Sequence, residues 1–181
     1  IPGLLIPHRN IPHLIRVLEN VSGDILLSFT KNQLEISHGT MRISSRIIDG
    51  LFPDYQELIP STHTTEAVVL KQDFVDSLKA TSVFSDHLHR ITSTISPHDG
   101  LFSIETEHGD VGHHLEHIPN PLLSGEHIQA AFNHRYVADC LGVIQGDSVS
   151  LQFTGKGKPL VIRGVLNRSF TYLVMPMHHE N

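Results

Sequence analysis

The chain has 181 residues, of which 39% are hydrophobic, and its formal net charge is −6 at pH 7. This length allows one domain or a domain and a half with a packed core, and no run approaches the ~18 apolar residues of a membrane-spanning helix. The single cysteine, Cys140, excludes an internal disulfide framework and fits a reducing cytoplasm. The acidic balance argues against nucleic-acid affinity over the whole surface, but it allows a locally basic face. No signal peptide is visible and the first residue is Ile1, so a truncated or processed start is expected.

The first third of the chain is predicted to form one helix and three strands. Apolar residues at i, i+3, i+4 and i+7 predict a helix over 7–20. The stripe of this helix consists of Ile11, Leu14, Ile15 and Leu18. Strands are expected at 25–29, 33–37 and 41–47. The Pro-, Ser- and Thr-rich stretch 60–65 is the best candidate for a linker.

The same order of elements recurs twice after this linker. In the second third, a strand at 67–70 and a helix at 72–81 precede three further strands. Those strands are expected at 91–95, 101–105 and 112–118. In the last third, a strand at 128–132 and a helix at 133–144 again precede three strands. These are expected at 149–153, 160–165 and 172–174.

The three blocks align without gaps at their helices, because His8, Lys71 and His134 are spaced 63 residues apart. A strand–helix–three-strand unit repeated at this period indicates duplication. Since one unit cannot bury both its sheet and its helix, two units should form a domain. Residues 63–181 are therefore expected to form one complete α+β domain with its two helices side by side. Residues 1–62 would be the second half of another domain, exposing its apolar helix stripe and an unpaired sheet edge.

Four motifs carry a resemblance to a known family. They are Ile6-Pro7-His8-Arg9, residues 47–55 with Phe52-Pro53-Asp54-Tyr55 at their end, Phe132-Asn133-His134-Arg135-Tyr136 and Tyr172-Leu173-Val174-Met175-Pro176-Met177. In order and spacing they resemble the bacterial sliding clamp, the beta subunit of DNA polymerase III, across essentially the whole chain. The resemblance implies clamp-type half-domain repeats, with helices on one face of antiparallel sheets. This chain then corresponds to the second half of the middle domain plus the whole third domain.

The resemblance also implies the function. Clamps are cytoplasmic rings of two subunits that encircle double-stranded DNA without reading its sequence, and they need no catalytic residue and no cofactor. They tether DNA polymerase, clamp loader and repair proteins through short linear peptides. The peptide groove would comprise Pro53, Leu58, Leu160, Leu173, Val174, Met175, Pro176 and Met177. The DNA-lining residues would be His8, Arg9, His13, Arg16, Lys71, Lys79, His134 and Arg135. The subunit contact would comprise Val83 and Phe84.

Several lining positions hold histidine where the family tends to have Lys or Arg. This predicts weak DNA contact at neutral pH, strengthening as the pH falls through ~6.5, the reference histidine pKa. The tail also has two interpretations from its residues alone. Pro176 stops a strand ladder, and Met175 and Met177 suit an adaptable groove. The alternative is a final core strand with an irregular end.

Other features of the sequence allow other interpretations. Histidines at 87, 89, 113, 114, 117, 178 and 179 suggest a metal site, because imidazole is the commonest metal ligand. No carboxylate sits at ligand spacing, however, so scattered surface histidines are favoured. The stretch 155–159 lacks the spacing of a phosphate-binding loop and predicts a hairpin turn instead. Cys140 is expected to be a small core residue. A last alternative is a truncated scaffold that binds peptides and does not encircle DNA.

Overall fold

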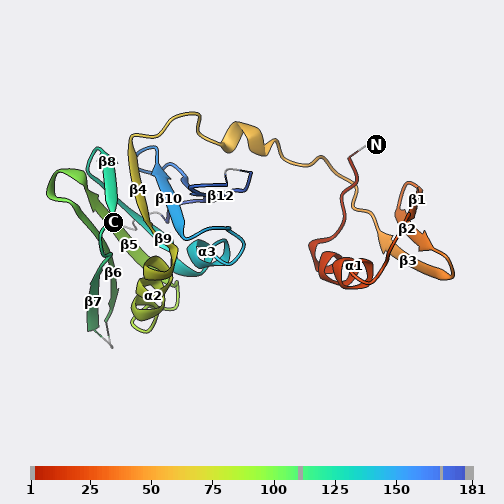
Figure 1. Ribbon diagram of the computed structural model, residues 1–181, viewed down its shortest axis with the longest axis horizontal. Coiled ribbons are helices and arrows are strands. Elements are labelled where there is room, and N and C mark those ends of the chain that lie inside the picture. Colours follow the sequence, from red (N-terminus) through yellow and green to blue (C-terminus); the bar gives the residue numbers. More distant parts are fainter. Residues whose placement is uncertain (1–2, 110–111, 168, 178–181) are drawn as a thin grey trace. The chain divides into compact units, whose positions relative to one another are not determined.

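The computed structural model describes residues 3–109, 112–167 and 169–177, and it divides the chain into two compact units (Figure 1). The first unit is Ile1–Asp54 and the second is Tyr55–Asn181. The sequence places the domain boundary between residues 62 and 63 instead. Thr64, which follows both of these boundaries, donates its backbone N–H to the Phe153 carbonyl at 2.8 Å and so attaches the linker to the second unit.

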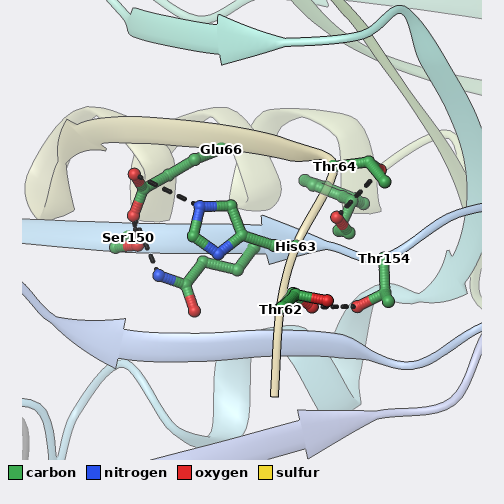
Figure 2. A network of polar contacts seen from close by, with 8 residues as sticks. Thr62, His63, Thr64, Glu66, Ser150 and Thr154 are labelled. Atoms are coloured by element: carbon green, nitrogen blue, oxygen red, sulfur yellow. Dashed lines mark hydrogen bonds and ion pairs between the residues drawn. The ribbon is translucent and has the colours of Figure 1, made fainter. Parts of the chain in front are cut away.

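Side chains strengthen this attachment of the linker (Figure 2). The Glu66 carboxylate accepts hydrogen bonds from the Ser150 hydroxyl at 2.6 Å and from the Gln152 amide at 2.9 Å. His63 Nε2 lies 3.8 Å from the same carboxylate. The Thr154 hydroxyl donates to the Thr62 carbonyl at 3.4 Å. Residues 62–64 are thus part of the second unit.

The first unit is one helix packed on a three-stranded antiparallel sheet. A 3₁₀ turn at His8–Asn10 leads into α1 (Ile11–Leu18). The sheet has the order β1 (Leu26–Phe29), β2 (Gln33–His38), β3 (Met41–Arg46). Leu14 of α1 is buried against Leu34 and Ile36 of β2. The Asn10 amide also donates to the Ser45 hydroxyl at 3.0 Å, which joins the start of the helix to β3.

The expectation that the whole α1 stripe is exposed is wrong. Leu14 is buried and Leu18 packs against the same cluster, because the helix covers its own sheet. Ile15 is exposed, as expected, and so is the neighbouring Val17. The small apolar core of this unit thus forms between its own helix and its own sheet.

The second unit contains two antiparallel sheets. The five-stranded sheet has the order β12-β11-β10-β4-β8, and the four-stranded sheet has the order β7-β6-β5-β9. The first comprises β12 (Thr171–Val174), β11 (Leu160–Gly164), β10 (Ser148–Phe153), β4 (Thr65–Leu70) and β8 (Leu122–Gly125). The second comprises β7 (Gly112–His117), β6 (Leu101–His108), β5 (Arg90–Ser96) and β9 (Ile128–Asn133). Short 3₁₀ turns lie at Tyr55–Leu58 and Pro97–Asp99.

The duplicated strand–helix unit is present in this second unit. β4 runs directly into α2 (Lys71–Ser82), and β9 runs directly into α3 (His134–Asp139). The two helices contact each other, as Figure 1 also shows. The equivalent residues Phe74 and Val137 are both buried in one core. The second equivalent pair in the same core is Leu78 and Leu141. The expected α+β fold with paired helices is confirmed.

Two elements differ from the sequence prediction. The helix expected over 133–144 ends at Asp139, because Gly142 follows within three residues and the chain turns there. Buried Leu141 and Ile144 keep the apolar pattern without helical geometry. Strand β8 was not predicted, since its four residues follow Pro121 and end in Ser124 and Gly125. Its pairing with β4 creates it.

Gly125 of β8 is required where the linker meets the five-stranded sheet. Its φ is +93°, and a Cβ atom there would lie 1.9 Å from the Thr64 carbonyl oxygen. Gly125→Ala should therefore lower the free energy of unfolding by at least about 2 kcal/mol, combining left-handed strain with a backbone clash. Gly142→Ala is the matched control, because nothing lies within 4 Å of a Cβ atom there. Urea denaturation of both variants measures the difference. Equal stability of the two variants would contradict the close approach of β8 to Thr64.

Candidate functional site

The two helices of the second unit enclose a groove with an apolar floor and a cationic rim. Its volume is about 610 Å³. Val75, Leu78, Ala138 and Leu141 supply the apolar surface. The rim holds Lys71, Lys79, His134 and Arg135, four of the eight residues expected to line DNA. The pairing of the duplicated helices brings them together: Lys71, His134 and Arg135 lie in the first turns of their helices, and Lys79 lies in the last turn of α2.

The two lysines of the rim are already engaged within the chain. Lys71 Nζ donates to the Ile144 carbonyl at 2.9 Å, which closes the turn after α3. Lys79 Nζ lies 3.3 Å from Asp76 Oδ1 on the same helix. The Gln72 amide, followed by Lys79, lowers the pKa of Asp76, so this carboxylate is ionised and offsets part of the rim charge. Arg135 is exposed, and its backbone N–H is capped by the Asn133 side chain at 3.0 Å.

His134 sits where the rim meets the loop after α2. Its ring lies edge-on to His89 with centroids 5.3 Å apart, and its Nε2 is 3.4 Å from the Ser85 hydroxyl. Its backbone N–H donates to the His89 carbonyl at 2.9 Å. Burial, followed by the charges of His89 and Arg135, lowers the pKa of His134. The expectation that His134 gains charge at ~6.5 is therefore wrong, and it needs a lower pH.

Sequence reasoning missed the two loop residues that surround His134. Ser85 and His89 precede it by more than forty residues, and no spacing pattern connects a loop to a helix start. His89 also has a positive φ of 57°. Only the pairing of β5 with β9, which starts at Arg90 and Asn133, places this loop beside α3.

The other four residues expected to line DNA lie in the first unit. His8 and Arg9 are on the 3₁₀ turn, and His13 and Arg16 are on α1. All four side chains are exposed. They lie away from the stripe that packs on the sheet, so this helix also presents a polar, cationic surface to solvent.

The tail has features of both a core strand and an exposed groove wall, the two interpretations that the sequence allowed. β12 pairs with β11, with Val174 opposite Leu160 and Leu173 opposite Val161. Val174 is only 3% exposed and Leu160 is also buried, whereas Met175 is 63% exposed. Two residues on, the Met177 backbone N–H donates to the Ala131 carbonyl of β9 at 2.7 Å. The tail is thus anchored to both sheets, with Met175 and Pro176 between the anchors.

These exposures correct the list of groove residues. Leu160 and Val174 support the tail from the core and do not present open surface. Leu173, Pro176 and Met177 are partly exposed, and Met175 is exposed. Leu58 is exposed in the second unit and Pro53 is exposed in the first.

The residues expected at the subunit contact lie beside a sheet edge. Val83, directly after α2, is 72% exposed. The ring of Phe84 stacks on His114 of β7 with centroids 4.9 Å apart and an interplanar angle of 13°. β7 is the terminal strand of its sheet, so Val83 and Phe84 accompany an open strand edge.

Two of the three histidines of β7 lie beside carboxylates. His113 contacts Glu105 and His114 lies 3.5 Å from Glu116. Across residues 3–109, 112–167 and 169–177, no three His, Cys, Asp or Glu side chains gather in a way that could hold a metal ion. His178 and His179 lie outside these residues.

Two further expectations are confirmed. Residues 155–159 form the turn between β10 and β11, where Gly155 and Gly157 have positive φ angles. Cys140 is a core residue, and burial raises the pKa of its thiol to about 12. Among the described helices, none has both the length and the apolar character needed to cross a membrane.

Comparison with known proteins agrees with the fold. A family model described as "DNA polymerase III beta subunit, C-terminal domain" matches residues 56–178. This chain belongs to that family. The beta sliding clamp of Synechocystis is 27% identical over 182 residues, which cover 99% of this chain and 46% of that protein. The clamp of Bacillus subtilis is 23% identical and is covered to 47% of its length. The chain thus spans about half the length of its clamp relatives.

Solved sliding clamps share the structure as well. The Bartonella birtlesii sliding clamp bound to griselimycin matches with a TM-score of 0.88 and 26% identity, over 99% of this chain and 48% of that one. The Pseudomonas aeruginosa clamp with ligand has a TM-score of 0.87 at 23% identity, over 97% of this chain and 48% of that one, which supports the fold alone. The expected family and fold are therefore confirmed.

The stability of this clamp fold depends on pH, because His134 is partly buried in it. Its pKa is lowered in the folded state, so the unfolded chain, with a histidine pKa of about 6.5, binds the proton more readily. The contribution of His134 to stability is complete above ~6.5 and is lost as the pH falls through the folded-state pKa. His134→Gln should therefore lose less stability than wild type between pH 7.5 and pH 5. The difference should be up to about 1.4 kcal/mol for each unit by which the folded and unfolded pKa values differ. Urea midpoints at both pH values measure this. The exposed His117, changed to Gln, is the control and should follow wild type.

Proposed function

We propose that this chain supplies DNA-facing and partner-binding surfaces of a sliding clamp. The full-length protein would close as a ring of two copies around double-stranded DNA and confer processivity on the replicative polymerase. It would bind DNA without sequence preference and dock polymerase, clamp loader and repair proteins through short linear peptides. The observation that carries this proposal is the side-by-side pairing of α2 and α3, which gathers Lys71, Lys79, His134 and Arg135 around one groove.

The chemistry of this rim suits phosphate contact without base reading. Its cations stand on two rigid helices, and phosphate contacts position a protein on DNA without specifying sequence. Because Lys71 and Lys79 have internal partners and the pKa of His134 is lowered, Arg135 is the most available cation. Binding by this chain should accordingly be weak. The role requires no catalytic group and no cofactor.

The salt dependence of DNA binding tests this proposal. Affinity for duplexes of unrelated sequence should be equal and should fall with salt, since binding releases counterions. Arg135→Gln should reduce the slope of log K against log salt by about 0.9, the loss of one phosphate contact. Lys156→Gln, on the β10–β11 turn, is the charge-matched control and should keep the wild-type slope. Fluorescence anisotropy measures both, and binding that is selective for sequence or indifferent to salt would exclude the proposed lining.

The open edge of β7 is proposed as the subunit contact. Exposed strand edges pair readily with another chain, and Val83 and Phe84 add apolar surface beside this one. In the full-length ring this edge would receive the first domain of the second copy.

The tail is proposed as a wall of the peptide groove. Met175 is exposed between two anchored residues, so the wall is fixed although its side chain can adapt to different ligands. Leu173, Pro176, Met177 and Leu58 would complete the apolar surface, with Leu160 and Val174 supporting it. The expected ligand is an extended peptide that bears leucine and an aromatic residue.

Two neighbouring substitutions separate groove from core in the tail. Met175→Ala should weaken peptide binding by about 1–2 kcal/mol and change the free energy of unfolding by less than about 0.5 kcal/mol. Val174→Ala should instead cost roughly 2 kcal/mol of folding stability, because its side chain is buried. Peptide titration and a melting curve on each variant provide the measurements. If Met175→Ala binds as well as wild type but melts much lower, the tail is core and the groove proposal fails.

A chain that binds peptide but shows no salt-dependent DNA binding would be the peptide-binding scaffold instead.

A further inference from the structure

The first unit contains a cavity of about 450 Å³ that no sequence motif predicted. It lies where the 3₁₀ turn before α1 meets the end of β3. Two arginines line it, Arg9 from the turn and Arg46 from the last position of β3. Asn32, before β2, and Asp49, after β3, supply the other polar side chains.

The walls of this cavity are held in place by backbone hydrogen bonds. The Ile47 N–H donates to the Asn32 carbonyl at 2.9 Å, and the Ile48 N–H donates to the Leu5 carbonyl at 2.8 Å. The Asn10 N–H donates to the Pro7 carbonyl at 2.9 Å. All three segments that carry the polar side chains are therefore fixed relative to one another within this unit.

Among the described residues, no carboxylate forms an ion pair with either guanidinium group. In the part of the chain that the structure describes, neither Arg9 nor Arg46 pairs with a carboxylate, and Asp49 lines the cavity without pairing with either. Arg42, four residues earlier on β3, differs in this respect because it lies 3.9 Å from Glu35. Two arginines and one aspartate line the cavity, so its side chains carry an excess positive charge that a bound anion would offset.

We propose that Arg9 and Arg46 form a phosphate-binding site. The guanidinium fork matches phosphate oxygens in geometry and charge, and paired forks select phosphate over a spherical anion such as chloride. Asn32 offers an amide donor on the same cavity. The phosphate group can belong to the DNA backbone or to free phosphate. The DNA source rests on the proposed clamp function, whereas the site itself does not.

The first arm of the test uses inorganic phosphate alone. Calorimetric titration at constant ionic strength should show binding to the wild-type chain. Arg46→Gln should raise the dissociation constant about tenfold or more, the loss expected for one charged hydrogen-bonding partner. Arg42→Gln, which removes the same charge from the same strand, should leave the constant unchanged. Arg46→Lys keeps the charge without the fork and should fall between wild type and Arg46→Gln.

Folding of each variant is checked by its melting curve in chloride buffer. If Arg46→Gln melts early, Arg9→Gln replaces it, because Arg9 is exposed and lines the same cavity. Equal phosphate affinity in wild type and Arg46→Gln overturns the site. Equal losses in Arg42→Gln and Arg46→Gln overturn it too, since general surface charge would then explain the binding.

The second arm repeats the salt dependence of DNA binding with the same variants. If the DNA backbone is the source, Arg46→Gln should lower the salt slope by about 0.9, whereas Arg42→Gln should not. Loss of phosphate binding without any change in the slope supports the site with free phosphate as its ligand. The proposed clamp function is judged separately by Arg135→Gln, so failure of the site and failure of that function give different results.

Discussion

The burial of two equivalent helices against each other and against their sheets is the constraint on which the second unit depends. Phe74 and Leu78 of α2, with Val137 and Leu141 of the α3 segment, all belong to one apolar core. A single strand–helix unit leaves one of its apolar faces in water, so duplication closes the core. The same closure sets the start of α2 beside the turn after α3, and the loop after α2 beside the start of α3. A packing requirement therefore creates the cationic rim that we assign to DNA.

The charges on that rim serve the fold as well as the proposed function. Lys71 closes the turn after α3, and Lys79 is paired with Asp76. Burial lowers the pKa of His134, so its charge is absent at neutral pH. The surface thus has fewer available cations than its residue types indicate. In the first unit the situation is reversed, because Arg9 and Arg46 share a cavity and neither forms an ion pair within the described part of the chain. Unpaired arginines, more than total positive charge, identify where an anion is best accommodated.

The tail illustrates how one short segment divides between stability and recognition. Val174 completes the last strand of the five-stranded sheet, and the Met177 backbone reaches β9 of the other sheet. Anchoring at both ends lowers the conformational entropy that the segment between them would lose on binding a ligand. Met175 can therefore be exposed without being mobile along its backbone, which suits a groove for varied peptides.

The sequence by itself determined the family, the repeat and the order of the strands, because apolar periodicity, turn residues and the 63-residue spacing of His8, Lys71 and His134 are local or regularly repeated signals. Tertiary structure alone decided the short strand β8 and the burial of Leu160 and Val174, since each depends on a neighbour far away in the chain. It also decided the environment of His134 and the convergence of Arg9 with Arg46. A pKa and an unpaired charge depend on which side chains and how much solvent surround a group, and only the folded chain brings those surroundings together.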